Sequence, residues 1–133
     1  MLNNLHQKIK EIHSSDYKFV IVSSGGGSNA IASLLEVPGA SNTVLEAYIP
    51  YAKESLDFYL LKKPDFYCSK ETALRMAAKA YSAAKKIDAE SSRKKLLGIA
   101  ITAALATNYK KEVIINFILL YRLRITQKAS HVS

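Results

Sequence analysis

The segment Tyr17-Lys-Phe-Val-Ile-Val22, followed at once by Ser23-Ser-Gly-Gly-Gly-Ser28, indicates the architecture of this chain. The first part is short and rich in β-branched and aromatic residues, which is typical of a buried strand. Three consecutive glycines then let the backbone turn sharply. The residues after Ser28 have helical character, so we predict a strand, a glycine-rich loop and a helix, which is the opening unit of an α/β fold.

Strands and helices alternate along the rest of the chain. Apolar residues at three- and four-residue steps predict an amphipathic helix before Tyr17. The turn Val37-Pro-Gly39 ends the helix that follows the glycines. Further strands are expected over residues 43–49, 96–102 and 113–121, and further helices over residues 51–61 and 70–86, the last with Ser69 as N-cap. We expect the stripe of Met76, Ala77, Ala80 and Ala83 to be the packing face of the last helix, and we expect a frayed tail beyond Thr126. This order predicts a three-layer α/β/α sandwich with a mostly parallel sheet.

The composition narrows the class of protein. The chain has 133 residues, of which 49% are hydrophobic and 23% charged, and this suits one domain with a core. It excludes a disordered polar chain, a collagen-like repeat and a disulfide-stapled miniprotein. The single cysteine, Cys68, cannot form an internal disulfide, and it excludes a cysteine-based zinc site unless His and carboxylates supply the other ligands. No run of about 18 apolar residues and no apolar leader is present, so we expect a cytoplasmic protein without a membrane partner.

The positive charge is concentrated in the second half of the chain. Residues 1–61 hold four Lys against six acidic residues, whereas residues 62–133 hold fifteen Lys and Arg against five. Such a half can attract anions at long range. Its basic residues are spread over helices and loops without a base-reading motif, so nucleic acid is not expected as a partner. A solvated surface and an anion-binding face both remain open.

The glycine-rich loop is the first candidate for a binding site. Without a Cβ atom, each glycine lets a ligand approach the backbone closely. The helix that follows would point free N–H groups and the positive end of its dipole at the loop, which favours a phosphate or a carboxylate. The loop is neither GxGxxG nor a Walker motif, and a merely tight turn is the alternative. This interpretation assigns ligand contacts to Ser23, Ser24, Gly25, Gly26, Gly27 and Ser28.

A second candidate cluster follows the strand over residues 43–49. It contains Tyr48, Tyr51, Lys53 and Glu54. Ligands of open α/β sheets bind outside the carboxyl ends of the strands, where this cluster and the glycine loop both lie. Tyr51 is a candidate for stacking on a ring or bonding a sugar, and Lys53 for pairing with a phosphate. Half-buried tyrosines beside a surface lysine are the alternative.

Other catalytic or metal sites find little support. His6 and His13 lie seven residues apart, and no carboxylate pattern completes a metal site, so no metal is expected. Ser24 has no histidine near it in the sequence to form a catalytic triad. Cys68 stands before the Ser69 cap, where a small packed residue is the simpler interpretation than a reactive thiol.

The order of several motifs resembles the CinA C-terminal domain family. The matching elements are Ser24-Gly-Gly-Gly-Ser28, Leu34-Leu-Glu-Val-Pro-Gly-Ala-Ser41, Tyr51, Cys68-Ser69 and Ile101-Thr102. The resemblance covers about residues 1–112 and is closest to a divergent branch that reads GGGS, VPGAS and VPYS in this order. It implies a three-layer α/β/α fold with a mixed sheet of about five strands. Enzymes of the family are nicotinamide-nucleotide amidases, hydrolases that release ammonia from nicotinamide mononucleotide.

The residues of the amidase motif are only partly kept. The motif serine of the family matches Ser24, and its Tyr-Ser-Asn-Glu-Ala-Lys matches Tyr51-Ala-Lys-Glu-Ser-Leu56, so the lysine that serves the amidase chemistry falls on Leu56. The family's Gly-Ile-Ala-Gly-Pro loop becomes the segment after Thr102, without its glycines and proline. Amide hydrolysis needs an activated nucleophile, and Ser24 then has no evident activator unless Lys53 reaches it.

The pattern of the family stops near Glu112. Residues 113–133 read as a divergent strand and tail, which we interpret as the result of a truncated or frameshifted reading frame after the CinA-like domain of residues 1–112. Loss of a closing helix would expose apolar surface and favour self-association.

Three functions remain open at this stage. The resemblance favours a nucleotide-binding domain that has kept its phosphate loop and lost the amidase chemistry. An active amidohydrolase would use Ser24 and Lys53 as catalytic residues, with Tyr51 and Thr102 among the ligand contacts. A degenerate fragment is the third reading. The expected ligand is a small nucleotide, no cofactor is expected, and the resemblance implies a homo-oligomer, because dimers are common among such domains.

Overall fold

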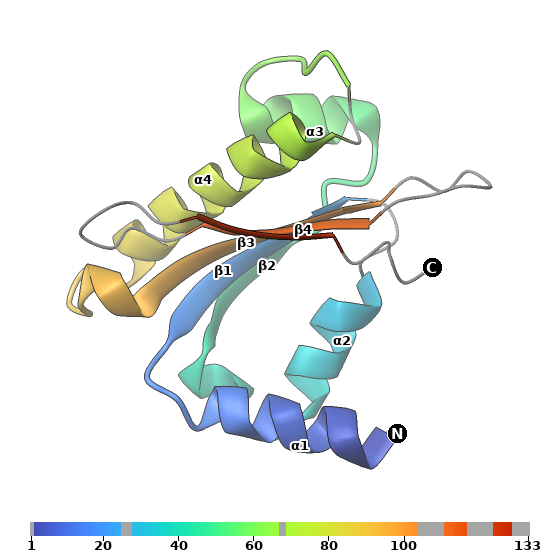
Figure 1. The fold of residues 1–133 in the computed structure, drawn as a ribbon. Helices are drawn as coiled ribbons and strands as arrows, with labels where there is room; N and C mark the ends of the chain where they lie inside the picture. The colour runs from blue at the N-terminus through green and yellow to red at the C-terminus, as the bar shows by residue number, and fades with distance from the viewer. Residues whose placement is uncertain (1, 25–27, 67–68, 104–110, 117–123, 129–133) are drawn as a thin grey trace.

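The computed structural model describes residues 2–24, 28–66, 69–103, 111–116 and 124–128 (Figure 1). In chain order the elements are α1 (Leu2–His13), β1 (Lys18–Ser24), α2 (Ser28–Glu36), η1 (Ala40–Asn42), β2 (Val44–Tyr48), α3 (Lys53–Leu60), α4 (Lys70–Ile87), η2 (Arg93–Lys95), β3 (Leu96–Ala103), β4 (Lys111–Asn116) and β5 (Arg124–Lys128), where η marks a short 3-10 helix.

The strands form one five-stranded sheet in the order β2-β1-β3-β4-β5. β1 runs parallel to both of its neighbours, whereas β4 and β5 add antiparallel pairs. Helices α3 and α4 cover one face of the sheet, and α1 and α2 lie on the other (Figure 1). The predicted three-layer α/β/α sandwich with a mixed sheet is confirmed.

Successive side chains of β1 point to opposite faces of the sheet, so the strand contributes to two hydrophobic clusters. Val20 and Val22 belong to the cluster under α3 and α4, while Phe19 and Ile21 pack with Ile31 of α2 on the opposite face. Because both faces are covered by helices, the strand is apolar throughout its centre rather than alternating with polar residues.

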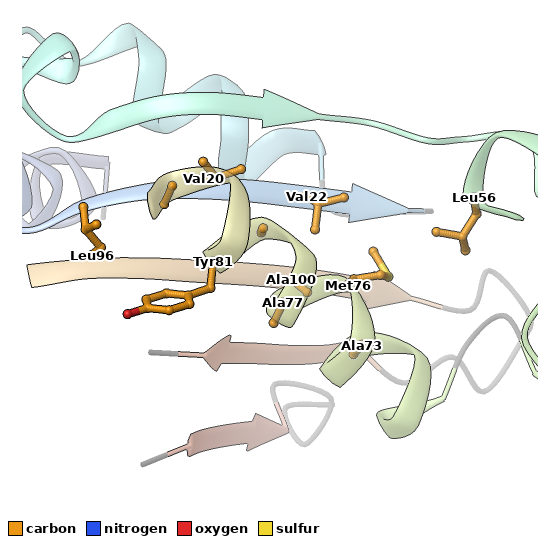
Figure 2. Packing of buried hydrophobic residues seen from close by; sticks show 11 residues of the cluster. Val20, Val22, Leu56, Ala73, Met76, Ala77, Tyr81, Leu96 and Ala100 are labelled. Atoms are coloured by element: carbon orange, nitrogen blue, oxygen red, sulfur yellow. The ribbon is translucent and has the colours of Figure 1, made fainter. Parts of the chain in front are cut away.

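Helix α4 lies very close to the sheet. Its inward side consists mainly of alanines together with Met76 and Tyr81, and Figure 2 shows several of these side chains beside β1 and β3. Gly98 of β3 permits this approach, since a Cβ atom there would lie 2.3 Å from the carbonyl oxygen of Ala77 and 2.3 Å from the backbone nitrogen of Tyr81. The predicted packing role is confirmed for the helix stripe, whose members are buried or partly buried: Met76, Ala77, Ala80 and Ala83.

The caps and turns around the helices follow local chemistry. The Ser69 side chain accepts a hydrogen bond of 3.1 Å from the backbone N–H of Thr72, so the predicted N-cap of α4 is confirmed. Gly39 adopts a positive φ of 101° in the turn that follows α2, as the Val-Pro-Gly pattern predicts. Helix α3 begins two residues later than expected, because Ala52 is still extended and serves as its N-cap.

The carboxyl-terminal part of the chain differs from the expectation of a frayed tail beyond Thr126. β5 continues to Lys128, and it pairs with β4 in antiparallel register from Asn116↔Arg124 to Glu112↔Lys128. The backbone groups of β5 form hydrogen bonds with β4 that a frayed tail would form with water. Pairing with β4, rather than local propensity, therefore extends the strand to Lys128. Of the strand predicted over residues 113–121, residues 113–116 lie in β4 and the rest lie outside the described residues.

A buried histidine joins the helices on the α1 and α2 face of the sheet. His13 donates a hydrogen bond from Nε2 to the carbonyl oxygen of Leu34, 2.8 Å away in the last turns of α2. Its Nδ1 pairs with the hydroxyl of Thr43, immediately before β2. One side chain of α1 therefore satisfies a carbonyl of α2 and a buried hydroxyl beside η1.

Candidate functional site

The carboxyl ends of β1, β2 and β3 meet at one edge of the sheet. β1 pairs with β3 in a register that sets Ser23 beside Ile101 and Ser24 beside Thr102. β2 ends beside β1 at the same edge, since Tyr48 pairs with Val22. The parallel strands thus bring together residues that lie up to 80 positions apart in the sequence.

Ser24 and Thr102 project from the same face of the sheet. They continue the alternation that places Val22 and Ala100 under α3 and α4, so both hydroxyls lie on that side. Ser23 lies on the opposite face, in line with Phe19 and Ile21. The sequence analysis assigned both serines to the loop. In the structure they are the last two residues of β1, and both are buried.

Two hydroxyls at this edge are buried without a partner. Among the described residues, Ser23 Oγ and Thr102 Oγ1 are inaccessible and make no hydrogen bond. An unpaired buried hydroxyl costs free energy, and such groups commonly mark a site whose ligand or water supplies the missing bond. The two atoms lie on opposite faces at the ends of adjacent strands.

Of the predicted phosphate-binding loop, the described residues are those that flank the three glycines. Gly25, Gly26 and Gly27 lie outside the described residues. Ser28 is the first residue of α2, as the sequence predicts, and α2 therefore begins directly after the loop. The amino end of a helix offers unpaired N–H groups that favour an anion.

Tyr51 lies in the connection between β2 and α3, and Lys53 lies at the start of α3. Tyr51 is 72% exposed in the extended segment before the helix, and Lys53 is the first residue of α3 and exposed. Ser24, by contrast, is only 7% exposed. Tyr51 can therefore contact a ligand from the solvent side of the edge.

Leu56 occupies the position that the resemblance gives to a lysine. Its side chain is 3% exposed and belongs to the cluster under α3 and α4 with Val22, Met76 and Ala100. Figure 2 shows Leu56 beyond the arrowhead of β1, with Met76 on the α4 side. The inward side of α3 next to the buried hydroxyls is thus apolar at this position.

The structure adds a tyrosine pair that the sequence reasoning missed. The rings of Tyr48 and Tyr59 lie 5.5 Å apart, and the Tyr48 hydroxyl donates to Glu46 at 2.8 Å. Lys79 Nζ lies 5.5 Å from the centre of the Tyr59 ring. Tyr59 lies one turn after Leu56 on α3, so the helical spacing of these two residues was the signal that could have revealed its inward direction.

Both tyrosines hold their protons more tightly than usual. Burial, followed by the nearby Tyr48 and Glu46, raises the pKa of Tyr59 well above its ordinary value. The hydrogen bond to Glu46, with some burial, raises the pKa of Tyr48. The Tyr59 hydroxyl oxygen is buried and has no hydrogen-bond partner among the described residues.

Within the described part of the chain, no group of three or more His, Cys, Asp or Glu side chains could hold a metal ion. His13 uses both ring nitrogens in the contacts to Leu34 and Thr43. In the same part of the chain, no helix is both long and apolar enough to cross a membrane. Cys68 lies outside the described residues.

Solved structures share this arrangement of strands and helices. The competence/damage inducible protein CihA from Agrobacterium tumefaciens superposes with a TM-score of 0.69 at 15% identity, over 94% of this chain and 78% of that one. The chain has the fold of CinA-superfamily proteins. A competence-damaged protein (CinA) superfamily protein from Escherichia coli gives 0.72 at 13% identity, over 96% and 76% of the two chains. One from Enterobacter cloacae gives 0.69 at 14% identity, over 93% and 75%.

No protein-family profile matches the chain, and no curated protein matches its sequence. At identities of this size the likeness concerns the fold. The CinA-like fold is therefore established here, and the function is argued from the residues of the site.

Proposed function

We propose that this CinA-like domain binds a small phosphate-bearing nucleotide at the carboxyl edge of its sheet without hydrolysing its amide. The observation that carries the proposal is the pair Ser24 and Thr102, which lie side by side in register, with Leu56 buried in the apolar cluster that contains Val22 and Ala100 of the same strands. The hydroxyls support binding, and the leucine argues against turnover.

The proposal that the domain binds a ligand rests on a buried hydroxyl that lacks a hydrogen-bond partner. The unpaired hydroxyl of Thr102 destabilises the ligand-free protein and gains a partner when a polar ligand group reaches it. The amino end of α2 follows β1, the strand that ends at Ser24, and favours a phosphate. Tyr51 offers an exposed ring beside this edge for stacking on a base or bonding a ribose.

The absence of turnover follows from the side chain at position 56. A serine hydroxyl attacks an amide only when a base accepts its proton. Leu56 is buried among apolar side chains and cannot accept a proton. Lys53 lies one turn earlier on α3 and is exposed, so it does not replace a buried amine at position 56.

The test combines binding and chemistry on one sample. Thermal unfolding is measured with nicotinamide mononucleotide, with nicotinamide riboside and with inorganic phosphate, and ammonia is assayed in the nucleotide mixture. We expect the nucleotide to raise the melting temperature, because a ligand at about 100 times its Kd stabilises the folded state by about 2.7 kcal/mol. The riboside should give a smaller shift, since it lacks the phosphate, and no ammonia should appear.

Two variants sharpen the result. Ser24→Ala should weaken nucleotide binding several-fold, while Ser33→Ala on α2 is the matched control that leaves it unchanged. Ammonia release by the wild type that disappears in Ser24→Ala contradicts the proposal and favours an active amidase, with Lys53 as the next residue to change. A folded sample with no shift for any of the three compounds contradicts the binding half.

A further inference from the structure

A small cavity lies between the first turns of α4 and the connector that joins α3 to α4. Its volume is about 100 Å³, and Ser24, Tyr51 and Thr102 are not among the residues that line it. Since one water molecule takes about 30 Å³ of the liquid, the cavity has room for about three. This space suits a small polar group and is too small for a whole nucleotide, so the cavity is separate from the proposed nucleotide site.

The connector is fixed to a helix at each of its ends. Leu61 ends α3 with a left-handed φ of 61°, and the N–H of Lys62 bonds back to a carbonyl of the last turn of α3 at 3.2 Å. At the other end, the carbonyl oxygen of Phe66 accepts hydrogen bonds from Thr72 Oγ1 of α4 and, at 3.3 Å, from Ser69 Oγ. These bonds hold the connector beside α4 and thereby define the two walls of the cavity.

Each wall carries one charge of each sign. Glu71 and Arg75 are four residues apart on α4 and therefore lie on the same side of the helix, while Lys62 and Asp65 belong to the connector. In the part of the chain that the structure describes, no ion pair joins these four side chains. A lone anion or cation is attracted by two of them and repelled by the other two. A molecule with one charge of each sign can face all four favourably.

An exposed aromatic ring adjoins these charges. Phe66 also lines the cavity, and its side chain is 72% exposed although its carbonyl is held by α4. Such a ring contributes little to the stability of the isolated fold, because apolar surface stabilises only when it leaves water. An apolar group of a ligand that covers the ring would add this contribution. The arrangement favours a ligand with two opposite charges at one end and an apolar group at the other.

We propose that this cavity binds a free α-amino acid with an apolar side chain. The carboxylate of the amino acid contacts Arg75, whose guanidinium can donate two parallel hydrogen bonds, and Lys62. The ammonium group contacts Glu71 and Asp65. The apolar side chain of the amino acid covers Phe66 at the mouth of the cavity. This site does not depend on the proposed nucleotide.

Titration calorimetry of the full chain with L-phenylalanine tests the site. We expect saturable binding below about 10 mM. 3-Phenylpropionate lacks the ammonium group and phenethylamine lacks the carboxylate. Each should bind about tenfold more weakly or worse, since it leaves desolvated charged groups of the cavity without a partner. L-Alanine should also bind more weakly than L-phenylalanine, because its methyl group covers little of the Phe66 ring.

Variants of the charged residues locate the site. Arg75→Gln and Glu71→Gln should each weaken the binding of L-phenylalanine about tenfold, because each removes the charge that one end of the ligand contacts. Lys86→Gln is the matched control, since it neutralises an exposed lysine in the last turn of the same helix, and it should leave binding unchanged.

Variants of two exposed phenylalanines test the apolar contact. Phe66→Ser should weaken the binding of L-phenylalanine more than that of L-alanine, because only the larger side chain covers the ring. Phe58→Ser removes a ring that is 79% exposed on α3 and does not line the cavity, so it should change neither affinity. Both side chains are exposed, so the melting temperatures of the two variants should stay close to that of the wild type.

Four results would overturn the proposal. The first is a folded wild type that binds no L-phenylalanine up to about 10 mM. The second is equal binding of 3-phenylpropionate or phenethylamine, which would mean that only one charge is recognised. The third is binding that persists unchanged in Arg75→Gln and Glu71→Gln, which would place the amino acid elsewhere. The last is a loss of nicotinamide mononucleotide binding in Arg75→Gln, which would assign the cavity to the nucleotide site; we expect this variant to bind the nucleotide as the wild type does.

Discussion

Two buried threonines illustrate how differently one residue type is used in this protein. Thr43 pairs its hydroxyl with His13 and thereby helps to join α1 to the start of β2. Thr102 is equally buried, but its hydroxyl has no partner among the described residues. The first contributes to stability, whereas the second reduces the stability of the ligand-free protein.

Replacement of Thr102 by valine tests this assignment. The two side chains have nearly the same shape, so Thr102→Val should raise the free energy of unfolding of the ligand-free protein by about 1 kcal/mol. The same variant should bind nicotinamide mononucleotide several-fold more weakly. Urea unfolding gives the first quantity and titration calorimetry the second.

Thr43→Val is the matched control, since it removes a hydroxyl that is bonded. It should lower the free energy of unfolding by about 1 to 2 kcal/mol, because the Nδ1 atom of His13 then loses its partner. A Thr102→Val variant that is destabilised to the same degree would mean that its hydroxyl has a structural partner in solution.

At the scale of single residues, the sequence predicted which side chains gather at the carboxyl edge but not how they face. Ser23, Ser24 and Thr102 were all predicted as ligand contacts. The register of β1 against β3 then places Ser24 and Thr102 on one face and Ser23 on the other. The sequence alone does not specify which residues of the two strands lie side by side, because the register of β1 against β3 is a nonlocal interaction.

Among the elements, α4 and β3 approach each other very closely at Gly98. Three backbone atoms of α4, from Ala77 and Tyr81, lie within 2.8 Å of the position that a Cβ atom on Gly98 would take. Because these are backbone atoms, a side chain at position 98 can be accommodated only by moving the helix away from the sheet.

Gly98→Ala should therefore be strongly destabilising. We expect the free energy of unfolding to fall by about 3 kcal/mol or more, since overpacking against fixed backbone disrupts the whole α4 contact. Chemical denaturation followed by circular dichroism measures the change.

Gly39→Ala is the comparison, because its Cβ atom would meet only a side chain, 3.1 Å from the Cβ atom of His13, and its cost is mainly the positive φ. That cost is about 1 kcal/mol. The reverse order of the two losses would contradict the close approach of α4 to β3.

The predicted elements are confirmed where caps and turns give a strong local signal. The bounds of the strands differ from the prediction where strand pairing determines them. Ser69 caps α4 and Gly39 follows α2, as their side-chain and backbone preferences require. β1 is two residues longer than its apolar run, because β3 continues alongside it to Thr102. β5 was not predicted, although Ile125 and Thr126 are β-branched, because its ladder to β4 is a nonlocal interaction.

At the scale of the whole molecule, the tyrosine pair Tyr48 and Tyr59 links stability to alkaline pH. The pKa of Tyr59 and that of Tyr48 are both raised above the ordinary 10.0. Above about pH 10 the unfolded chain loses these protons while the folded protein keeps them. The contribution is therefore complete at lower pH, and stability should fall as the pH rises from about 10.

Urea unfolding at about pH 8, 10 and 11 measures this dependence. Tyr59→Phe should flatten the alkaline loss, and Tyr48→Phe should flatten it less, since its pKa is raised chiefly by the hydrogen bond to Glu46 rather than by burial. Equal slopes for the wild type and Tyr59→Phe would contradict the burial of this hydroxyl.

The local pattern of the chain determined its fold class, its main helices and strands, and the positions of Ser23, Ser24 and Tyr51 at or just after strand ends. Those properties follow from hydrophobic periodicity, caps and turns, which act over a few residues. Only the tertiary structure decided that Leu56 is buried under β1, that Tyr59 faces Tyr48, that Thr102 lacks a partner and that Leu61 is exposed in a left-handed conformation. These properties depend on which distant segments pack together, and no short-range preference encodes such contacts.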